Sequence, residues 1–498
     1  MAYKTGALPR SLYTAEGVRR IDRAAIEGCG IPGMTLMERA GAAAFAVLRE
    51  HWPAARRPAV VCGAGNNAGD GYVVARLAHA AGLAVTVLEC AEHGRLKGDA
   101  RTAAEAAMAA GIVPQSFDAG LLPQHDLIVD ALLGTGLARE VGGTLGLCIE
   151  AINGSGVPVL AIDLPSGLDA DTGSALGRAV IARATITFIG VKQGLLTGAG
   201  PDHCGRLYHD DLGVPAAVVR AVDPSAERLD LSRWSAWLRP RRRSAHKGHF
   251  GHVLVVGGEI GYAGAARMAA EAALRVGAGL VSLATRARHA AEAGITRPEI
   301  MCHPIEEAAA LGALCEKANV VAIGPGLGRS PWAVALFARA LDSGLPLCVD
   351  ADGLNLLAEE PMRREDWVLT PHPGEAGRLL GCDTEAVQAD RFEAARGLQR
   401  RYGGVVVLKG TGTLVCDRAG RISVCDAGNP GMASGGMGDV LSGVIAGLIA
   451  QGLSPDEAAA LGVCLHALAG DRAALAGQRG TVAMDLMPHL RALVNPGE

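Results

Sequence analysis

Short apolar runs rich in β-branched residues alternate with longer alanine-rich amphipathic segments along almost the whole chain. This alternation predicts buried strands separated by crossover helices, which is the pattern of a doubly wound α/β sheet with a parallel core. In the first half the predicted strands are residues 59–63, 84–89, 126–130, 157–163 and 184–190, and the predicted helices include residues 72–81 and 99–110.

The alternation weakens between residues 211 and 247, where three prolines and a short arginine cluster fall, and then starts again. We therefore expect two α/β domains, residues 1–225 and residues 226–498. In the second half the predicted strands are residues 252–258, 279–285, 319–324, 346–351, 367–371 and 404–410, followed by a hairpin of residues 413–417 and 421–426.

Composition and charge narrow the class of protein. Of the 498 residues, 49% are hydrophobic and 20% are charged, as in globular domains, and the formal net charge is -4. This charge gives no reason to expect nucleic acid or an anionic membrane as a partner. No uninterrupted apolar run reaches the ~18 residues of a membrane span. The twelve cysteines contain no C-x-x-C pair, so we expect a cytoplasmic protein with neither a zinc site nor a disulfide framework.

The segment from Gly428 to Gly443, GNPGMASGGMGDVLSG, is the most informative motif. Its glycines let backbone N–H groups approach a ligand closely, and the apolar helix pattern that follows adds the free N–H donors of a helix start. Together these groups make an anion hole suited to a phosphoryl group in transfer. Asp439 is placed to take a proton from an attacking hydroxyl. The alternative is a glycine-rich turn that caps a helix.

Polar oxygen donors follow three predicted strands of the first half. Ligands bind at the carboxyl ends of the strands in such sheets, and hard oxygen donors gathered there favour a cation or a ribose. Well-made turns are the structural alternative, because Asn and Asp tolerate turn conformations. The donors are Asn66, Asn67 and Asp70 in the run GAGNNAGDG, Asp130 in VDALLGTG and Ser166 in DLPSGLD.

Two ionisable residues of the first half are candidates for acid–base work. Asp163 ends an apolar strand, and Lys192 follows the apolar run TITFIG. Partial burial would shift the pKa values of both groups toward ranges that are useful in catalysis. A structural ion pair is the alternative.

The strings LMERAG, GAGNNAGDG, VDALLGTG and DLPSGLD, in this order, resemble the NAD(P)H-hydrate epimerase family over most of residues 11–215. The resemblance implies a Rossmann-like domain that interconverts the two epimers of hydrated NADH or NADPH. It implies a potassium ion on Asn67, Asp130 and Ser166. Ala68 stands where the family usually has glycine. The hydrated dinucleotide would contact Asn66, Asn67, Ala68, Gly69, Asp70, Gly134, Thr135, Gly136, Leu137, Ala138, Arg139, Glu140 and Asp163.

The second half carries glycine-rich or charged strings at the ends of its apolar runs, among them GPGLG, VDADGLNLL, TPHPGEAGRLL and VVLKGTGTLV. LKGTGT is not a Walker A loop, because Lys409 precedes the glycines. The order of strand, Lys-Gly, hairpin and Gly-Gly-x-Gly-Asp resembles that of ribokinase-like kinases. His372 lies between two prolines, and we favour substrate contact over core packing for it.

The whole set resembles the ADP/ATP-dependent NAD(P)H-hydrate dehydratase family, a branch of the ribokinase-like fold, over roughly residues 243–490. The resemblance implies that Asp439 is the catalytic base. Where some branches carry Thr in the glycine loop, this chain has Ser434 and Met437. The nucleotide contacts carried over are Lys409, Gly410, Thr411, Gly412, Thr413 and Gly438, and the contacts to the hydrated dinucleotide are Ala265, Gly326, His372 and Asp439.

Together the two resemblances predict an enzyme that repairs hydrated NADH and NADPH. An N-terminal Rossmann-like epimerase would supply the epimer that a C-terminal ribokinase-like dehydratase consumes, using ADP or ATP, Mg²⁺ and K⁺, in a homo-oligomer. A small-molecule kinase of the ribokinase-like class is an alternative, but it gives no reason for the first half. A non-catalytic dinucleotide-binding regulator is another, although it would need no base at Asp439 or Asp163.

Overall fold

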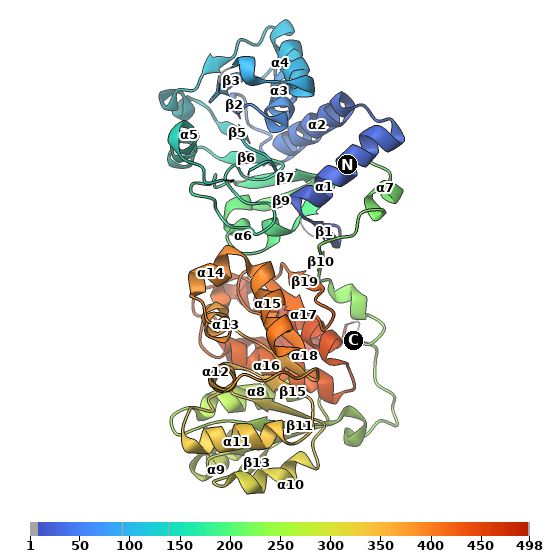
Figure 1. Ribbon diagram of the computed structural model, residues 1–498, viewed down its shortest axis with the longest axis vertical. Coiled ribbons are helices and arrows are strands. Elements are labelled where there is room, and N and C mark those ends of the chain that lie inside the picture. Colours follow the sequence, from blue (N-terminus) through green and yellow to red (C-terminus); the bar gives the residue numbers. More distant parts are fainter. Residues whose placement is uncertain (1–7, 92, 138, 497–498) are drawn as a thin grey trace. The chain divides into compact units, whose positions relative to one another are not determined.

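The computed structural model describes residues 8–91, 93–137 and 139–496. The chain divides into two compact units, Met1–Glu227 and Arg228–Glu498, called here the N-terminal and the C-terminal unit (Figure 1). Both units are α/β layers of helices on a mostly parallel sheet, so the expected fold class is confirmed.

The N-terminal unit is built on a parallel sheet in the order β4-β3-β2-β5-β6-β7-β9. Successive residues of a strand point to opposite faces of a sheet. Accordingly, Val60 and Cys62 pack toward α2 and α3, while Ala59 and Val61 pack toward α5. The strands are β2 (Pro58–Cys62), β3 (Thr86–Glu89), β4 (Gln115–Ser116), β5 (Leu127–Ala131), β6 (Val159–Ile162), β7 (Ala184–Phe188) and β9 (Arg206–Asp210).

The helices of this unit cover both faces of the sheet (Figure 1). They are α1 (Ala15–Arg23), α2 (Gly33–His51), α3 (Asn66–Ala80), α4 (Gly98–Ala109), α5 (Gly143–Gly154), α6 (Gly200–Cys204) and α7 (Ala216–Arg220), and a single π-helical turn, Ala24–Gly28, continues α1. Short strands complete the unit: β1 (Ser11–Tyr13) pairs in parallel with β8 (Val191–Lys192) and antiparallel with β10 (Ala226–Arg228).

The C-terminal unit has the strand order β13-β12-β11-β14-β15-β16-β17-β18-β19. Pairing is parallel as far as β17, and the hairpin β18–β19 then adds antiparallel strands at one edge. The strands are β11 (His252–Val256), β12 (Leu280–Thr285), β13 (Met301–Pro304), β14 (Val320–Ile323), β15 (Leu347–Val349), β16 (Trp367–Leu369), β17 (Val405–Leu408), β18 (Thr413–Cys416) and β19 (Ile422–Cys425).

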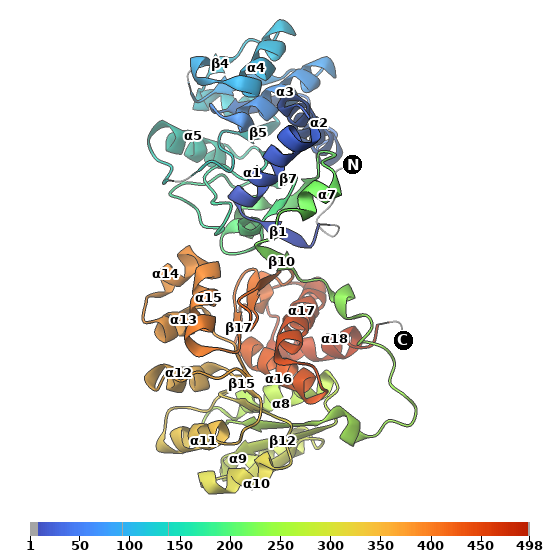
Figure 2. The same cartoon turned by 45° about the vertical axis from the view of Figure 1, so that its right-hand side comes forward.

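Helices cover both faces of this second sheet (Figure 2). One face carries α8 (Ala263–Arg275), α16 (Met437–Ala450), α17 (Pro455–Ala473) and α18 (Leu486–Leu493). The remaining helices of this unit are α9 (Ala287–Thr296), α10 (Gly312–Cys315), α11 (Pro331–Leu341), α12 (Ala351–Glu359), α13 (Pro373–Leu380), α14 (Thr384–Ala389) and α15 (Arg391–Tyr402).

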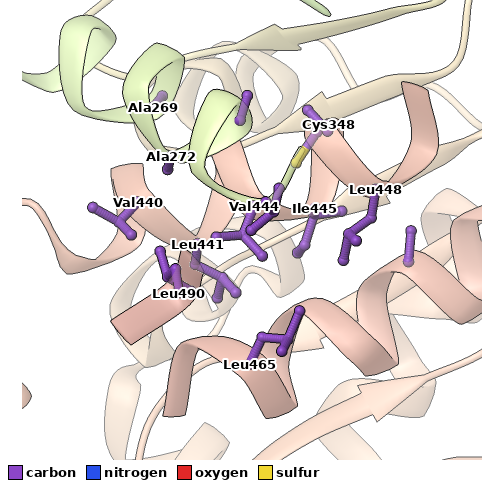
Figure 3. Packing of buried hydrophobic residues seen from close by; sticks show 14 of the residues in the cluster. Ala269, Ala272, Cys348, Val440, Leu441, Val444, Ile445, Leu448, Leu465 and Leu490 are labelled. Carbon is purple, nitrogen blue, oxygen red and sulfur yellow. The ribbon is translucent and has the colours of Figure 1, made fainter. Parts of the chain in front are cut away.

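Helix α16 is the centre of the C-terminal core. Its apolar side chains, including Val440, Leu441, Val444 and Ile445, are buried among α8, α17 and α18 (Figure 3). Glycine sets its distance from α8, because a Cβ at Gly443 would lie 2.0 Å from the carbonyl oxygen of Ala269. This close packing of small residues holds the N-terminus of α16 in a defined position.

Within the described residues, Pro455–Ala476, which consists of α17 and the turn after it, is long and apolar enough to cross a membrane by length and composition. This helix was not predicted from the sequence as a candidate membrane span. In the structure, 67% of its apolar window is buried, so packing in the core of the C-terminal unit accounts for its composition.

The structure corrects two local expectations. The predicted glycine-rich turn around residues 63–70 is largely helical, because α3 begins at Asn66 instead of near Tyr72. Several short strands were not predicted, namely β1, β4, β8, β9, β10 and β13. Most of them have two to four residues and lie at or near sheet edges, where a short polar strand carries little hydrophobic pattern.

Candidate active sites

A cavity of about 1450 Å³ opens at the carboxyl edge of the N-terminal sheet. Its walls come from the segments that follow β2, β5 and β6 and from helices α1 and α3. This is the edge at which open α/β sheets bind their ligands. Most of the predicted dinucleotide contacts line it: Asn66, Asn67, Asp70, Gly134, Thr135, Gly136, Leu137, Arg139, Glu140 and Asp163.

The other two predicted contacts that the structure describes lie behind this surface. Ala68 and Gly69 are buried in α3 and do not line the cavity. The methyl group of Ala68 is fully buried in the hydrophobic core, so α3 accommodates alanine where the family usually has glycine. Ala138 lies outside the described residues.

The predicted metal residues meet beside the cavity. Ser166 donates its hydroxyl to Asp130 Oδ1 at 2.6 Å and its backbone N–H to Asp130 Oδ2 at 2.8 Å. Asn67 donates its amide to the carbonyl oxygen of Leu133 at 2.9 Å, but its buried Oδ1 has no hydrogen-bond partner among the described residues. Burial raises the pKa of Asp130 to about 6. A buried carboxylate beside an unpartnered amide oxygen is an arrangement that a cation would stabilise.

Asp163 and Lys192 form a buried ion pair in the wall of the same cavity. Lys192 also donates to Thr187 Oγ1 and to the carbonyl oxygen of Phe188, both at 3.1 Å. Asp163 has a φ of 69°, in the left-handed region that residues other than glycine rarely adopt. Such backbone strain is concentrated at functional sites, so the geometry favours a functional pair over a purely structural one.

In the C-terminal unit, the glycine-rich segment ends in the first turn of α16, with Gly436 as the N-cap at φ 94°. Asp439 lies in this first turn, half-buried, and no described residue is a hydrogen-bond or ion-pair partner of its carboxylate. The pKa of Asp439 is raised to about 7, first by burial and then by Asp350. A group that changes protonation state near neutral pH is suited to general acid–base catalysis.

The glycine loop itself contains an unsatisfied donor. Ser434 Oγ is buried without a hydrogen-bond partner among the described residues. Met437 is buried in the core cluster, so its side chain does not face the loop's ligand side. A buried hydroxyl next to the free N–H groups of a helix start is a suitable contact for a phosphate oxygen.

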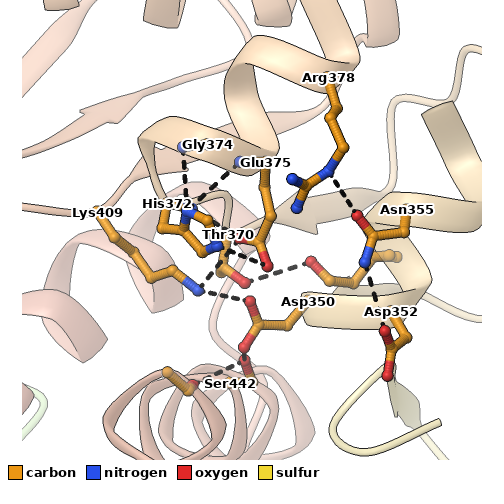
Figure 4. A network of polar contacts seen from close by, with 12 residues as sticks. Asp350, Asp352, Asn355, Thr370, His372, Gly374, Glu375, Arg378, Lys409 and Ser442 are labelled. Atoms are coloured by element: carbon orange, nitrogen blue, oxygen red, sulfur yellow. Dashed lines mark hydrogen bonds and ion pairs between the residues drawn. The ribbon is translucent and has the colours of Figure 1, made fainter. Parts of the chain in front are cut away.

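Lys409 lies next to this loop at the end of β17 (Figure 4). Its ammonium contacts Asp350 Oδ1 at 2.7 Å and Glu375 Oε2 at 3.7 Å. Burial alone would lower the pKa of Lys409, but these two carboxylates raise it. A Cβ at Gly438 would lie 3.0 Å from Lys409 Nζ, so the lysine and the glycine loop are in direct proximity.

His372 caps α13 instead of packing in the core. Its Nδ1 accepts from the backbone N–H groups of Gly374 at 3.0 Å and Glu375 at 3.4 Å, while Glu375 Oε2 accepts from the backbone N–H of His372 (Figure 4). Half of the ring is exposed. Burial of the other half and the charge of Lys409 lower its pKa, so the ring is neutral at pH 7.

The remaining predicted contacts lie at two further strand ends. Gly326, at φ 57°, approaches α8 so closely that a Cβ there would lie 3.2 Å from the Cβ of Ala265. Gly410, Thr411, Gly412 and Thr413 form the tight connection between β17 and β18, where Thr413 Oγ1 donates to the carbonyl oxygen of Gly410 at 2.9 Å. The structure thus gathers the predicted residues at the carboxyl edge of this sheet.

No role was predicted from the sequence for the carboxylates that surround Asp439. Asp350 accepts from Lys409 and, at 2.7 Å, from Ser442. Asp352 accepts from the backbone N–H of Gly328 at 2.9 Å, and Glu375 completes the group. The signal was present, because Asp350 directly follows β15 and Glu375 lies in the TPHPGEAGRLL string.

Comparisons with known proteins agree with this architecture. The family model of NAD(P)H-hydrate dehydratase matches residues 253–491, and the model of the YjeF-related protein N-terminus matches residues 33–194. The bifunctional NAD(P)H-hydrate repair enzyme of Coxiella burnetii is 52% identical over 97% of this chain and 99% of its own length. The enzyme of the same name from Escherichia coli is 45% identical over 98% of this chain and 95% of its own length.

Solved structures are also similar to about half of this chain. The ADP/ATP-dependent NAD(P)H-hydrate dehydratase from Bacillus subtilis, co-crystallized with ATP/Mg²⁺, is 26% identical, covers 51% of this chain and 92% of its own, and has a TM-score of 0.47. The identity over almost the full length of the curated relatives, together with the two family models, places this chain in the family of bifunctional NAD(P)H-hydrate repair enzymes, with an epimerase unit followed by a dehydratase unit.

Proposed function

We propose that the C-terminal unit dehydrates hydrated NADH or NADPH by phosphorylating its ring hydroxyl, with Asp439 as the general base. The observation that carries this proposal is the free carboxylate of Asp439, whose pKa is raised to about 7, in the first turn of α16 directly after the glycine loop. Asp439 takes the hydroxyl proton as the oxygen attacks the terminal phosphorus of ADP or ATP.

The glycine loop stabilises the negative charge that develops on the transferring phosphoryl group. The free N–H groups at the start of α16, the hydroxyl of Ser434 and the ammonium of Lys409 are the available donors. Arg391 holds the backbone that carries Lys409 in place, because it donates to the carbonyl oxygens of Leu408 at 3.2 Å and Lys409 at 3.1 Å. The donors are therefore set before the nucleotide binds.

Magnesium fits this site as a companion of the nucleotide. Among the described residues, no three His, Cys, Asp or Glu side chains lie close enough to hold a metal by themselves. Mg²⁺ is commonly bound by one or two carboxylates together with substrate phosphates. Asp350, Asp352 and Glu375 are the carboxylates near Asp439, and when bound the ion would neutralise charge on the phosphates.

Phosphorylation lowers the barrier to elimination because it replaces a poor leaving group with a good one. The ring nitrogen supplies the electron pair that expels phosphate, the neighbouring ring carbon then loses a proton, and the carbon–carbon double bond of NADH or NADPH is restored. We place the hydrated nicotinamide beside Asp439 and propose His372, Ala265 and Gly326 as its further contacts.

The N-terminal unit supplies the epimer that the C-terminal unit accepts. We place the hydrated dinucleotide in the 1450 Å³ cavity, with its pyrophosphate at the N-terminus of α3 and its nicotinamide near Asp163 and Lys192. A potassium ion fits Asn67, Asp130 and Ser166, because the unpartnered Asn67 Oδ1 and the buried Asp130 carboxylate are oxygen donors without a compensating positive charge. When bound, the ion would fix the loop that carries Leu133 beside the cavity.

The test follows the near-ultraviolet absorbance of reduced nicotinamide. The full chain is mixed with both epimers of hydrated NADH, ADP or ATP, and magnesium. Recovery of the whole pool as NADH supports both activities, and arrest near half of the pool, when spontaneous epimerisation is slow, contradicts the epimerase. No recovery with either nucleotide contradicts the dehydratase. A phosphorylated hydrate that accumulates instead would support a small-molecule kinase. Light scattering tests the expected homo-oligomer.

A further inference from the structure

The cavity of the N-terminal unit contains a carboxylate to which no role has yet been given. Asp22 lies in the last turn of α1 and lines the cavity together with Asp70, Asp163 and Lys192. It is half-buried, and no described residue is a hydrogen-bond or ion-pair partner of its side chain. Helix α1 is fixed over the cavity, because Arg19 donates to the carbonyl oxygen of Thr135 at 3.0 Å.

Epimerisation of the hydrate needs two proton-carrying groups. The hydroxyl lies on a ring carbon bonded to the ring nitrogen, so the nitrogen lone pair can expel it and form a C=N⁺ bond. The departing hydroxyl must gain a proton, and the water that adds to the other face must lose one. One fixed side chain does not serve both faces of a planar ring, so a second group is required.

Asp163 and Lys192 account for only one of these groups. Asp163 Oδ1 already accepts from Lys192, from Thr187 Oγ1 at 3.4 Å and from the backbone N–H of Phe188 at 3.3 Å. These donors hold the Asp163 carboxylate in one orientation, so the pair serves only one face of the ring. The second group should be another carboxyl that lines the same cavity and has no such hydrogen-bond donors.

Resting on the epimerase function proposed above, we propose that Asp22 is the second catalytic acid–base residue of the N-terminal unit, opposite in role to the pair Asp163 and Lys192. In one direction Asp22 gives its proton to the departing hydroxyl, the C–O bond breaks and water leaves. A new water then forms a C–O bond on the other face and gives its proton to Asp163. The number of protons is conserved, and the reverse reaction exchanges the two roles. Before another turnover in the same direction, Asp163 releases its proton to water and Asp22 takes one up from water.

The electrostatics around Asp22 support its role as the proton donor. Its pKa is raised, first by burial, and the charges of Asp163 and Asp99 raise it further, while Lys192 opposes them. Asp70 is another carboxyl of the cavity that has no hydrogen-bond donor among the described residues, and burial together with the charges of Asp163 and Asp22 raises its pKa well above the usual range. A strongly raised pKa favours the protonated form, so Asp70 is less suited than Asp22 to alternate between the two forms.

The experiment uses the full chain with both epimers, excess nucleotide and magnesium. NADH should appear in two phases, because the dehydratase consumes its own epimer first and the epimerase then supplies the rest.

Asp22→Asn should leave the first phase within about twofold of wild type. It should slow the second phase by about 100-fold or more, with little change in KM. Asp22→Glu should recover part of this loss. Glu27→Gln, an exposed carboxylate beyond the cavity on the same helical run, is the matched control.

A second measurement does not depend on how Asp22 variants fold. Asp99→Asn removes a charge that raises the pKa of Asp22, so the high-pH limb of the second phase should move to lower pH, by about half a unit. An unchanged second phase in Asp22→Asn, a loss seen only in KM, or an unmoved limb in Asp99→Asn would overturn the proposal. Absence of the second phase in the wild type would instead contradict the epimerase function itself.

Discussion

The ammonium of Lys409 lies 2.7 Å from Asp350 Oδ1, although the two residues are 59 positions apart in the chain. The positive charge of the lysine beside the glycine loop is therefore partly balanced by a carboxylate of the protein itself. Only 2% of the Asp350 side chain and 18% of the Lys409 side chain are exposed, so removal of one partner leaves a buried charge without compensation.

We expect Asp350→Leu to lower the free energy of unfolding of the C-terminal unit by about 3 kcal/mol, since breaking a buried pair strands its partner. Lys409→Met combined with Asp350→Leu should cost clearly less than the sum of the two single changes. Denaturant unfolding followed by circular dichroism measures all four chains. Additive single effects would show that the two residues do not form a coupled pair.

Asp439→Asn should lower kcat of the dehydratase by about 10² to 10⁴, because the base is lost while the shape of the loop is kept. Nucleotide binding, measured by calorimetry, should change little. Epimerisation of the hydrates, followed by separation of the two epimers without nucleotide, should be unaffected because it takes place in the other unit. Wild-type kcat in this variant would exclude Asp439 as the base.

The dehydratase should have an acid limb near pH 7. The pKa of Asp439 is raised to about 7 by burial and by Asp350, Asp352 and Glu375, against the opposing charge of Lys409. Because the base must be deprotonated, kcat/KM should rise as pH increases through this value and fall below it. Asp352→Asn removes one of the negative charges, so the limb should move to lower pH. A limb that stays in place would contradict the assignment.

Gly438→Ala should weaken nucleotide binding and dehydratase activity by about tenfold or more. The added Cβ would lie 3.0 Å from Lys409 Nζ and 3.3 Å from Asp350 Oδ2, so it forces the ion pair or the loop to move. Gly294→Ala is the matched control, because open space surrounds that position in α9. Steady-state kinetics and calorimetry on both variants make the comparison, and equal behaviour would contradict the steric argument.

Replacement of potassium by choline should slow epimerisation in the wild type but leave dehydration of the accepted epimer unchanged. Asn67→Leu removes the buried oxygen that lacks a partner, so epimerisation by this variant should be slow and no longer respond to potassium. The two-phase absorbance assay reports both activities in one experiment. A potassium response that persists in Asn67→Leu would place the ion elsewhere.

The parallel core of both sheets could be predicted because its strands are buried on both faces. The strand predicted at residues 59–63 corresponds to β2, Pro58–Cys62, and the strand predicted at residues 252–258 corresponds to β11, His252–Val256. The start of α3 could not be predicted, since Gly65, Asn66 and Asn67 are typical of turns. In the structure, packing against α2 and α4 extends the helix to Asn66 despite this local preference.

In the candidate sites too, some residues could be predicted from the sequence and others could not. Asp439 stood out because glycines and a helix start surround it in the sequence, and Asp163 and Lys192 because each lies at the end of an apolar run. Asp350, Glu375 and Asp22 did not stand out. Their roles depend on which side chains meet them from distant segments, and a carboxylate at the end of α1 carries no local mark of the cavity that it faces.

The left-handed backbone of Asp163 sets which substitutions that position can tolerate. At φ 69°, Gly and Asn are tolerated best beside Asp, and a longer acid such as Glu is strained even though it keeps the charge. Asn fits the backbone but lacks the negative charge that Lys192 requires, whereas Glu has the charge but fits poorly. No single replacement satisfies both demands. We therefore expect aspartate at this position to vary less among related sequences than its chemical role alone would require.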